Sequence, residues 1–406
     1  MRVLAVNQFY APDQAATSQL LTELCEDLVD AGDEVTVVAS PGNYLGGGDQ
    51  LPPREWIRGV EVRRPWATRL GKGSIPRRLS DYTSFWASAV LAVARAQRPD
   101  VVLALTTPPM IAAGTAIVTR LRDVPLVTWV QDVYPDVAVR FGVVGARHPA
   151  TLGLRAINRA TYAHATSIVA LSRGMAERLT TQGADPDKVE VIPNWSDSAR
   201  LTPVEHADNP FRRQLEAQHG LPRDAFVAMY SGNLGAGHDI QTLVEAARHV
   251  DPKRIHFVFI GEGAAKAKAR RSSRGLTHVH FLPYQPRESL AQSLSAADVH
   301  LASLRSDLAG LLVPSKLYGV MAVGRPLFYL GPPHCEVSEV IVRHEIGWVG
   351  DGSAVDLATA LTTWSQDDDK CRRQGRLARA VFLRHYDRQH AVSRWRNVLD
   401  SAVRRE

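Results

Sequence analysis

The stretch at residues 314–326 reads Pro-Ser-Lys-Leu-Tyr-Gly-Val-Met-Ala-Val-Gly-Arg-Pro and predicts a capped helix. Proline fits a first helical turn, the Ser315 side chain can cap free amides, and the final glycine and proline end the run. The next residues, Leu-Phe-Tyr-Leu at 327–330, are typical of a short buried strand. Unpaired amides and Lys316 at such a helix start suit an anion. The alternative is a core helix whose lysine is merely solvated.

A second unit of strand, turn and helix lies upstream. Residues 226–230 form a β-type run, residues 231–237 read Ser-Gly-Asn-Leu-Gly-Ala-Gly, and a helical pattern follows at about 239–248. This layout brings backbone amides against a phosphate. The glycines do not match the dinucleotide fingerprint, and no Gly-Lys-Ser/Thr follows, so neither a dinucleotide site nor a P-loop is predicted.

Apolar runs of β type alternate with helical patterns along the chain. The β-type runs are 3–5, 35–39, 101–105, 126–130, 168–171 and 189–192, then 226–230, 255–260, 279–282, 299–302 and 327–330. Such alternation predicts parallel sheets covered by helices, and a chain of 406 residues suits two domains. We therefore expect a first domain at 1–193, a polar linker and hinge at 194–222, and a second domain at 223–385.

Composition narrows the class of protein. Apolar residues make up 45% of the chain, enough for substantial cores. Cys25, Cys335 and Cys371 lie far apart without metal-ligand spacing, so we expect no disulfide framework and a reducing cytoplasm. The chain starts as a strand and not as a signal peptide. The uncharged run at 101–119 is divided by a proline pair, which favours a strand, a turn and a helix over a membrane span.

Basic and aromatic residues are mixed between Arg63 and Trp86. They are Arg63, Arg64, Trp66, Arg69, Lys72, Arg77, Arg78, Tyr82, Phe85 and Trp86. No nucleic-acid-binding motif accompanies the net charge of +6, so we expect no nucleic-acid partner. The mixture fits an anionic membrane surface better, and we expect a peripheral contact there. A solvated basic face is the alternative.

Taken in order, the motifs at 226–237, 257–263, 281–285 and 314–326 resemble the C-terminal half of family 4 glycosyltransferases. The first half of the chain is similar to that family's N-terminal half, and the nearest branch resembles transferases of the colanic-acid and surface-polysaccharide type. The resemblance implies the α/β GT-B fold, with two Rossmann-like domains facing a cleft. It also implies that a last helix, at about 386–406, crosses back onto the first domain.

The family resemblance implies a retaining transferase whose co-substrate is a nucleotide diphosphate sugar, without a separate cofactor. The acceptor is either a lipid-linked sugar or a soluble small molecule such as a natural-product precursor. A lipid-linked acceptor places the protein at the inner face of the cytoplasmic membrane. Two rivals are a non-catalytic sugar-nucleotide-binding subunit and a sugar-nucleotide epimerase of the same fold.

Ligands of open α/β sheets bind at the carboxyl ends of the strands, so residues just after strands are the site candidates. The catalytic candidates are Asp132 and Lys316, and a cap for the segment from Tyr134 is the alternative role for Asp132. The donor-binding candidates are Asn233, Gly235, His238, Gly261, Glu262, Gly263, Tyr284, Ser315 and Tyr318. A loop of the first domain adds Ala15, Ala16 and Thr17, although Thr17 or Ser18 can simply cap the next helix.

The sequence departs from the family pattern at several of these positions. Ala15-Ala16 stand where relatives have a glycine pair, and Gln131 stands where many have a histidine. Asn233 and His238 replace two cations, unless bound phosphates protonate His238. Leu311 and Gly319 replace a pair of glutamates, which we interpret as a mark of the subfamily.

No metal site is predicted. Asp185-Pro-Asp187 has the spelling of a metal-binding carboxylate pair, but it lies in a helix-to-strand turn. His278 and His280 share a strand face without a third ligand at a suitable spacing. Lys316 and the loop around Gly235 would instead stabilise a departing diphosphate.

Overall fold

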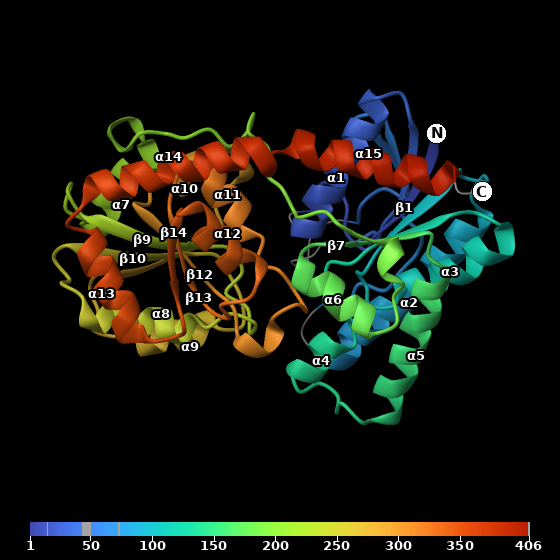
Figure 1. Ribbon diagram of the computed structural model, residues 1–406, viewed down its shortest axis with the longest axis horizontal. Helices are drawn as coiled ribbons and strands as arrows, with labels where there is room; N and C mark the ends of the chain where they lie inside the picture. The colour runs from blue at the N-terminus through green and yellow to red at the C-terminus, as the bar shows by residue number, and fades with distance from the viewer. Residues whose placement is uncertain (14, 43–49, 72–73, 405–406) are drawn as a thin grey trace. The chain divides into compact units, whose positions relative to one another are not determined.

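The computed structural model describes residues 1–13, 15–42, 50–71 and 74–404, and these form two compact α/β units (Figure 1). Unit 1 contains residues 1–193, Gly310–Leu312 and the chain from Ala391 onward. Unit 2 contains Asn194–Ala309 and Val313–His390. The stretch 310–312, which the sequence analysis assigned to the second domain, therefore packs with the first.

Unit 1 is built on an eight-stranded sheet with the order β3-β4-β2-β1-β5-β6-β7-β8. Its strands are β1 (Arg2–Val6), β2 (Glu34–Val38), β3 (Arg54–Ile57), β4 (Val60–Arg63), β5 (Val101–Leu105), β6 (Leu126–Trp129), β7 (Ser167–Ala170) and β8 (Val189–Val191). All neighbours are parallel except β3, which runs antiparallel to β4 at the edge. The central strands are buried along most of their length, as apolar runs of this kind require.

The helices of unit 1 are α1 (Ala16–Asp30), α2 (Ile75–Arg95), α3 (Ile111–Arg122), α4 (Asp136–Arg140), α5 (Pro149–His164), α6 (Arg173–Thr181) and α15 (Arg388–Arg404), with a short 3-10 helix η1 (Pro186–Lys188). The uncharged run at 101–119 is thus a strand, a turn and a helix, as predicted. No helix among the described residues is both long and apolar enough to cross a membrane.

The pair α2 and α3 covers the sheet with a close-packed core. Phe85 on α2 is fully buried, and the Trp86 indole donates a hydrogen bond to the Met110 carbonyl at 2.8 Å. A Cβ on Gly114 of α3 would lie 2.6 Å from the Trp86 ring, so glycine there lets the two helices approach. Two aromatic residues of the predicted membrane stretch therefore belong to the core.

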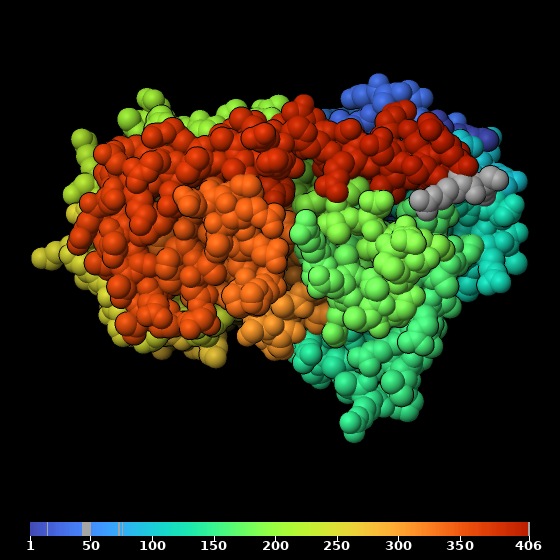
Figure 2. Space-filling model, in the orientation of Figure 1, coloured from blue at the N-terminus to red at the C-terminus, as the bar shows by residue number. Residues whose placement is uncertain are grey.

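The C-terminal helix α15 packs on unit 1 from Ala391 onward. Trp395 is fully buried, with its ring centroid 4.6 Å from that of Trp129, and Leu399 is buried beside it. Arg396 forms an ion pair with Asp33 at 3.1 Å. The opposite side of the helix is open to solvent (red, Figure 2).

Unit 2 is built on a six-stranded parallel sheet with the order β11-β10-β9-β12-β13-β14. Its strands are β9 (Phe226–Ser231), β10 (Ile255–Ile260), β11 (Val279–Leu282), β12 (Val299–Ser303), β13 (Leu327–Leu330) and β14 (Gly347–Gly350). Its helices are α7 (Pro210–His219), α8 (Ile240–Ala246), α9 (Lys266–Ser272), α10 (Leu290–Ser295), α11 (Lys316–Ala322), α12 (Glu336–His344), α13 (Ala354–Trp364) and α14 (Asp368–His385), with short 3-10 helices η2 (His206–Asp208), η3 (Ala247–His249), η4 (Arg287–Ser289) and η5 (Ser306–Leu308).

The segment predicted as a linker, 194–222, is part of unit 2 and contains η2 and α7. The Arg212 guanidinium is buried and bonds Asp298 at 3.1 Å. Ser198 donates through its backbone amide and its hydroxyl to the buried Asp387 carboxylate, at 3.0 and 2.7 Å. These contacts hold the segment on unit 2. Its polar residues therefore anchor it there and do not form a free hinge.

Candidate functional site

The glycine loop, residues 232–237, connects β9 to α8 in unit 2. The Tyr230 hydroxyl donates to the Asn233 carbonyl at 2.8 Å and fixes the start of the loop. Within the described parts of the chain, the amides of Gly235, Ala236 and Gly237 donate to no acceptor. Backbone amides without an acceptor are the group that a phosphate can accept from.

A second turn, Gly261–Gly263 after β10, touches the glycine loop backbone to backbone. The Leu234 amide donates to the Glu262 carbonyl at 2.9 Å. Gly261 and Gly263 have φ values of 134° and 153°, and a Cβ on either would lie within 2.4 Å of a loop carbonyl. These glycines therefore act first by allowing the close packing of two turns.

Lys316, the first residue of α11, extends along the glycine loop. Its ammonium lies 4.6 Å from the centroid of the Tyr230 ring, and its Cε lies 3.0 Å from where a Cβ on Gly232 would stand. No described carboxylate pairs with this ammonium, and burial lowers the pKa of Lys316 to about 7. A desolvated cation without a counter-ion, next to free amides, is arranged to receive an anion.

His238 is a neutral hydrogen-bonding group. Its Nδ1 donates to the Ser303 carbonyl at 2.5 Å, so Nε2 carries the free lone pair. Burial and, second, the Lys316 charge lower the pKa of His238 to about 3. Nε2 can accept from a hydroxyl, whereas the expectation that phosphates turn His238 into a cation conflicts with this environment.

The other donor-side candidates are Tyr284, Glu262 and Asn233. Burial is the main cause that raises the pKa of Tyr230, and repulsion from an ionised Tyr284 is the second. Tyr284 therefore lies near Tyr230. The Glu262 side chain is exposed and forms an ion pair with Lys266 at 2.6 Å. Asn233 is exposed at the start of the glycine loop. The structure thus gathers these residues with Gly235, His238, Gly261, Gly263 and Lys316 at the carboxyl ends of the strands.

Ser315 and Tyr318 lie at the start and in the middle of α11. Ser315 has a helical backbone, is exposed and makes no side-chain cap, and α11 runs only from Lys316 to Ala322. Tyr318 is fully buried, and its ring centroid lies 5.5 Å from that of Tyr386. The predicted cap by Ser315 is therefore wrong, whereas the donor-binding role of Tyr318 stays a prediction; its buried hydroxyl has no hydrogen-bond partner among the described residues.

Arg305 is a candidate that the sequence analysis missed. Its backbone amide donates to the Gly237 carbonyl at 3.0 Å, and its guanidinium pairs with Asp307 at 2.8 Å. An arginine directly after β12 was the available signal, because that position follows a strand at the same sheet edge. Its backbone is thus fixed to the glycine loop, while the charge of its side chain is paired with Asp307.

Asp132 lies after β6 in unit 1. Its amide donates to Thr106 Oγ1 at 3.3 Å, and the next amide, from Val133, donates to the Leu311 carbonyl at 2.9 Å. The Tyr134 amide donates to the main-chain carbonyl of Asp132 at 3.2 Å, and not to the Asp132 carboxylate. The alternative role as a cap is therefore wrong. Burial raises the pKa of the Asp132 carboxyl to about 6.

The turn that carries Asp132 is anchored by Asp136, the first residue of α4. The Asp136 carboxylate is buried and accepts from Arg155 at 2.6 Å, from Arg178 at 3.1 Å and from Gln182 at 2.5 Å. These donors come from α5 and α6. A buried carboxylate satisfied from two helices fixes the position of the turn.

Residues 310–312 form a strap that lies against this turn within unit 1. Leu312 pairs with Asp132 in an antiparallel bridge, and Leu311 is buried. Gly310 has φ +70°, and a Cβ there would lie 2.9 Å from the Gly174 carbonyl. The position where relatives carry a glutamate therefore holds an apolar side chain that packs.

The loop candidates of the first domain, Ala15, Ala16 and Thr17, lie at the start of α1. Ala15 is the N-cap of α1, and its amide donates to the Asp13 carboxylate at 2.7 Å. Ala16 and Thr17 are the first helical residues, and the Ser18 hydroxyl donates to the Asp13 carbonyl at 3.1 Å. A cap by Thr17 or Ser18 is therefore wrong, because the helix begins before both.

The carboxylate pair Asp185-Pro-Asp187 lies in a turn, as the sequence analysis expected. Asp185 is the N-cap of η1 and accepts from the Asp187 amide at 3.0 Å. His280 faces His256 on the neighbouring strand, with Nε2 and Nδ1 3.2 Å apart in hydrogen-bond contact. Among the described residues, no group of three or more His, Cys, Asp or Glu side chains is arranged to hold a metal ion.

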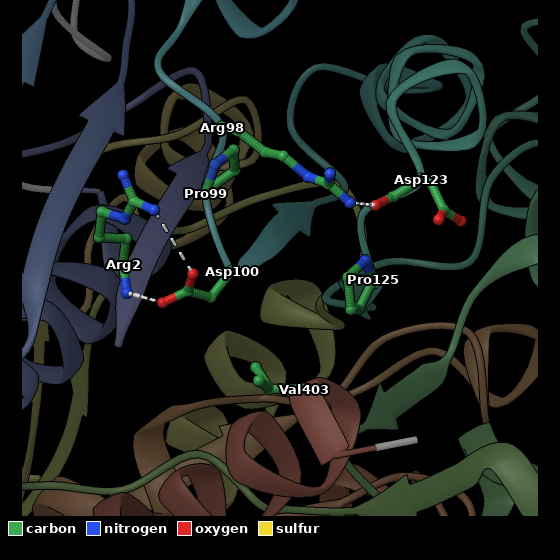
Figure 3. A pocket seen from close by; sticks show the side chains of 7 residues that line it. All are labelled: Arg2, Arg98, Pro99, Asp100, Asp123, Pro125 and Val403. Atoms are coloured by element: carbon green, nitrogen blue, oxygen red, sulfur yellow. Dashed lines mark hydrogen bonds and ion pairs between the residues drawn. The ribbon is translucent and has the colours of Figure 1, made fainter. Parts of the chain in front are cut away.

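A pocket of about 200 Å³ lies at the amino ends of β1 and β5 in unit 1 (Figure 3). The Arg2 amide donates to Asp100 at 2.6 Å, and the Arg98 guanidinium donates to the Asp123 carbonyl. Its polar groups thus bond one another, and it lies at the sheet edge opposite to the strand ends that carry the site residues. We assign no function to it.

Family comparisons agree with this geometry. The family described as "Glycosyl transferase 4-like domain" matches residues 17–195, and "Glycosyl transferases group 1" matches residues 211–381. A solved structure of sucrose-phosphate synthase from Thermosynechococcus elongatus has a TM-score of 0.77 over 100% of both chains, at 16% identity. The chain is a glycosyltransferase of the GT-B fold.

This glycosyltransferase is similar to curated proteins of the surface-polysaccharide branch. It is 26% identical to WcaI of Escherichia coli K12, which is assigned to colanic acid biosynthesis, over 80% of this chain and 82% of that one. It is 29% identical to the glycosyltransferase WbjE of Pseudomonas aeruginosa, over 64% of each chain. The structure of Anabaena HepE with UDP and glucose has a TM-score of 0.70 at 16% identity, over 99% of this chain and 100% of that one. These findings identify a transferase, and not a binding subunit or an epimerase.

Proposed function

We propose that this glycosyltransferase stabilises the departing nucleoside diphosphate with Lys316 and the glycine loop, without a catalytic metal ion. The observation that carries the proposal is the buried Lys316 ammonium, which lies against the start of the glycine loop at Gly232 and has no described counter-ion. The amides of Gly235, Ala236 and Gly237 in the same loop donate to no described acceptor. Fixed donors in a dry site stabilise developing negative charge without reorganisation.

We further propose that transfer proceeds with retention, a proposal that rests on the family resemblance. The bond between the anomeric carbon and the β-phosphate oxygen breaks, and the acceptor oxygen bonds that carbon on the same face. The acceptor proton passes to the departing phosphate oxygen. The task of the protein is then alignment and charge stabilisation. His238 Nε2 is a lone pair that can accept from a donor-sugar hydroxyl.

The acceptor that we favour is a lipid-linked sugar. The supporting observation is the similarity to WcaI, which is assigned to colanic acid biosynthesis. A soluble small molecule is the alternative acceptor. Transfer to a polyprenyl-linked sugar in detergent, compared with transfer to free sugars, distinguishes the two.

A screen of nucleotide sugars tests the donor proposal. We expect one nucleotide sugar to raise the melting temperature of the protein, since a ligand that binds only the folded state stabilises it. Uridine diphosphate sugars come first because HepE was solved with UDP-glucose. With the selected donor, product analysis should show transfer to an acceptor with the anomeric configuration kept. An inverted product would overturn retention, and no response to any nucleotide sugar would overturn the donor class.

Affinity for a nucleoside diphosphate should fall as pH rises above about 7. Burial lowers the pKa of Lys316 to about 7 when no ligand is bound, and a bound diphosphate favours the charged amine. Binding at higher pH must therefore include uptake of one proton, which costs up to about tenfold in affinity per pH unit. Calorimetry in buffers of different ionisation enthalpy measures that uptake directly. The Lys316→Arg variant stays charged and should show a flat profile, and a flat wild-type profile would contradict the assignment.

Chelators should leave transfer activity unchanged if Lys316 and the glycine loop stabilise the diphosphate. The Asp185→Ala, Asp187→Ala double variant should also keep its activity, because Asp185 caps a turn. Initial rates with and without a chelator test both statements. Loss of activity that manganese or magnesium restores would show that a metal ion stabilises the leaving group instead.

A further inference from the structure

The basic stretch expected from the sequence to touch a membrane is partly tied up inside unit 1. Arg63 pairs with Glu61 at 2.8 Å, and the Arg64 side chain is buried. Lys72 lies outside the described residues, whereas Trp66 is exposed. A peripheral membrane contact through this stretch therefore stays a prediction.

Four histidines of unit 2 lie close together at one side of its sheet. His256 is in β10, His278 directly precedes β11, His280 is within β11, and His219 is the last residue of α7. His280 pairs with Val258, two residues after His256, so the side chains of His256 and His280 are on the same face of the sheet. This is the face that α7 covers (Figure 1). We call the four residues the imidazole cluster.

The rings of the imidazole cluster contact one another directly. The Nδ1 atom of His256 and the Nε2 atom of His280 are 3.2 Å apart in hydrogen-bond contact, and the two rings stack with 7° between their planes. The His280 ring centroid lies 5.1 Å from that of His219, and the His256 centroid lies 6.5 Å from that of His278. A hydrogen bond between two ring nitrogens needs a donor and an acceptor, so at least one of the two stacked imidazoles must be neutral.

The imidazole cluster is buried and contains ring nitrogens without partners. The side chains of His256, His278 and His280 are all buried. His278 Nε2 donates to the Ala247 carbonyl at 2.8 Å, which leaves its Nδ1 atom with a lone pair. That Nδ1 atom and His256 Nε2 have no hydrogen-bond partner among the described residues. A proton added to either nitrogen would be a buried charge without an acceptor, which is costly.

The groups around the stacked pair do not compensate such a charge. Arg212 of α7 disfavours a proton on His256, as do the other histidines of the cluster. The carboxylates of Asp298 and Glu216 pair with Arg212, at 3.1 and 3.4 Å. Among the described residues, no carboxylate pairs with a histidine of the cluster. On the other side of His256, β9 contributes the apolar Val227.

The protonation of the stacked pair is linked to the stability of unit 2. Burial, followed by the charges of His219, His256 and His278, lowers the pKa of His280 to about 4. Burial, followed by His278 and Arg212, lowers the pKa of His256. The unfolded chain, whose histidines have pKa values of about 6.5, takes up these protons first. The stability that rests on the neutral pair is therefore complete above about pH 6.5 and is lost as pH falls from there towards about 4.

We propose that the imidazole cluster is an acid-sensitive device that keeps α7 packed on β10 and β11 only while the stacked histidines are neutral, so that unit 2 opens reversibly in acid. A first proton puts an unpaired charge into the layer under α7. A second proton would set two donors against each other at the contact between the rings. The inference goes beyond the proposed function and does not depend on it.

The device acts below the pH range in which Asp132 titrates. In the folded protein His280 takes up its proton only near pH 4, because its pKa is about 4. Without denaturant, unit 2 should therefore stay closed near pH 6, where the Asp132 carboxyl changes its charge. Between these values the loss of stability is measured in urea.

Thiol labelling in urea reports on the two units separately. Cys25 is buried in unit 1, and Cys371 is buried in unit 2. A dipyridyl disulfide labels exposed thiols in mild acid, and mass spectrometry assigns each label. We expect the urea midpoint for Cys371 to fall between about pH 7 and about pH 5, because each histidine shifts the unfolding equilibrium by up to about tenfold per pH unit. The midpoint for Cys25 should fall less, and equal falls at both thiols would overturn the proposal.

Matched variants assign the effect to the imidazole cluster. In the His256→Gln, His280→Gln double variant the two amides can still bond one another, but neither titrates. The change in the unfolding equilibrium of unit 2 between about pH 7 and about pH 5 should then shrink by about tenfold or more. His280→Gln alone should give part of this effect and serves if the double variant does not fold. The control is His249→Gln, an exposed histidine of the same unit, which should behave like wild type. An unchanged pH response in the test variants, or an equal loss in the control, would overturn the proposal.

Return to neutral pH decides whether the device is reversible. After exposure to acid and return to about pH 7, Cys371 should regain its protection from labelling and the rate of sugar transfer should be restored. Permanent exposure of Cys371 would overturn the reversible device. Absence of transfer in every sample, including untreated protein, would concern only the proposed function, because labelling needs neither donor nor acceptor.

Discussion

Lys316→Ala should lower the rate of sugar transfer by about 100-fold while leaving the fold intact. This is the effect of removing one donor to a developing oxyanion. The ammonium lies against the glycine loop at Gly232 and has no counter-ion among the described residues, so its loss removes charge stabilisation without freeing a buried acid. Steady-state rates with saturating donor, beside a melting curve, measure both parts of the prediction.

Lys266→Ala is the matched control for that experiment. Lys266 lies in the same unit, but its ammonium is neutralised by Glu262 at 2.6 Å and donates to the Gly261 carbonyl at 2.8 Å. We expect a small change in turnover for this variant, because its charge is already paired. If Lys316→Ala turned over like wild type, the proposed diphosphate site would have to be abandoned.

The fold was predictable where strands are buried on both faces. The run Val101–Leu105 is continuously apolar, the run Ile255–Ile260 is apolar except for His256, and they reappear as β5 and β10 with the same bounds. The strands β3, at the sheet edge, and β4, beside it, escaped prediction because charged residues make up half of each. The strand β14 has glycine at both ends and one valine, a pattern that predicts a turn equally well.

Helix starts were less predictable, because capping depends on the path of the chain before the helix. Ser315 is a good cap by composition, yet its backbone is already helical and its hydroxyl caps nothing. Thr17 lies inside α1, because the Asp13 carboxylate accepts a hydrogen bond from the Ala15 amide and the helix begins directly afterwards. A residue type predicts a cap only when the neighbouring turn leaves the amides free.

The sequence predicted that Lys316 lies beside the glycine loop, but it could not predict the electrostatics of these residues. Positions after parallel strands meet at one sheet edge, which brought Lys316 to the glycine loop as expected. Burial is a tertiary property, so the low pKa of His238 and its bond to Ser303 were invisible in the chain. The strap at 310–312 pairs with Asp132 across a long sequence separation, and no local sequence pattern predicts that pairing.

We propose that the Asp132 carboxylate aligns the acceptor or the donor sugar. Asp132→Asn should then lower turnover on the order of 100-fold, the cost of a misplaced reactant, and should leave nucleotide affinity nearly unchanged. Asp132 belongs to unit 1, whereas the proposed nucleotide contacts around Gly235 and Lys316 belong to unit 2. Burial raises the pKa of the carboxyl to about 6, so wild-type activity should fall as pH drops through 6, where the carboxylate takes up a proton. The asparagine variant cannot titrate and should lack this acid limb.

The asparagine substitution also separates chemistry from structure. The Asp132 carboxylate makes no cap, and its backbone bonds to Thr106 and to the strap survive the change, so the melting temperature should stay close to wild type. Asp187→Asn, at an exposed turn of the same unit, is the control and should keep both the turnover and the acid limb. Unchanged turnover in Asp132→Asn, or an acid limb that persists there, would remove Asp132 from the reaction. A loss of nucleotide affinity as large as the loss of turnover would instead assign Asp132 to donor binding.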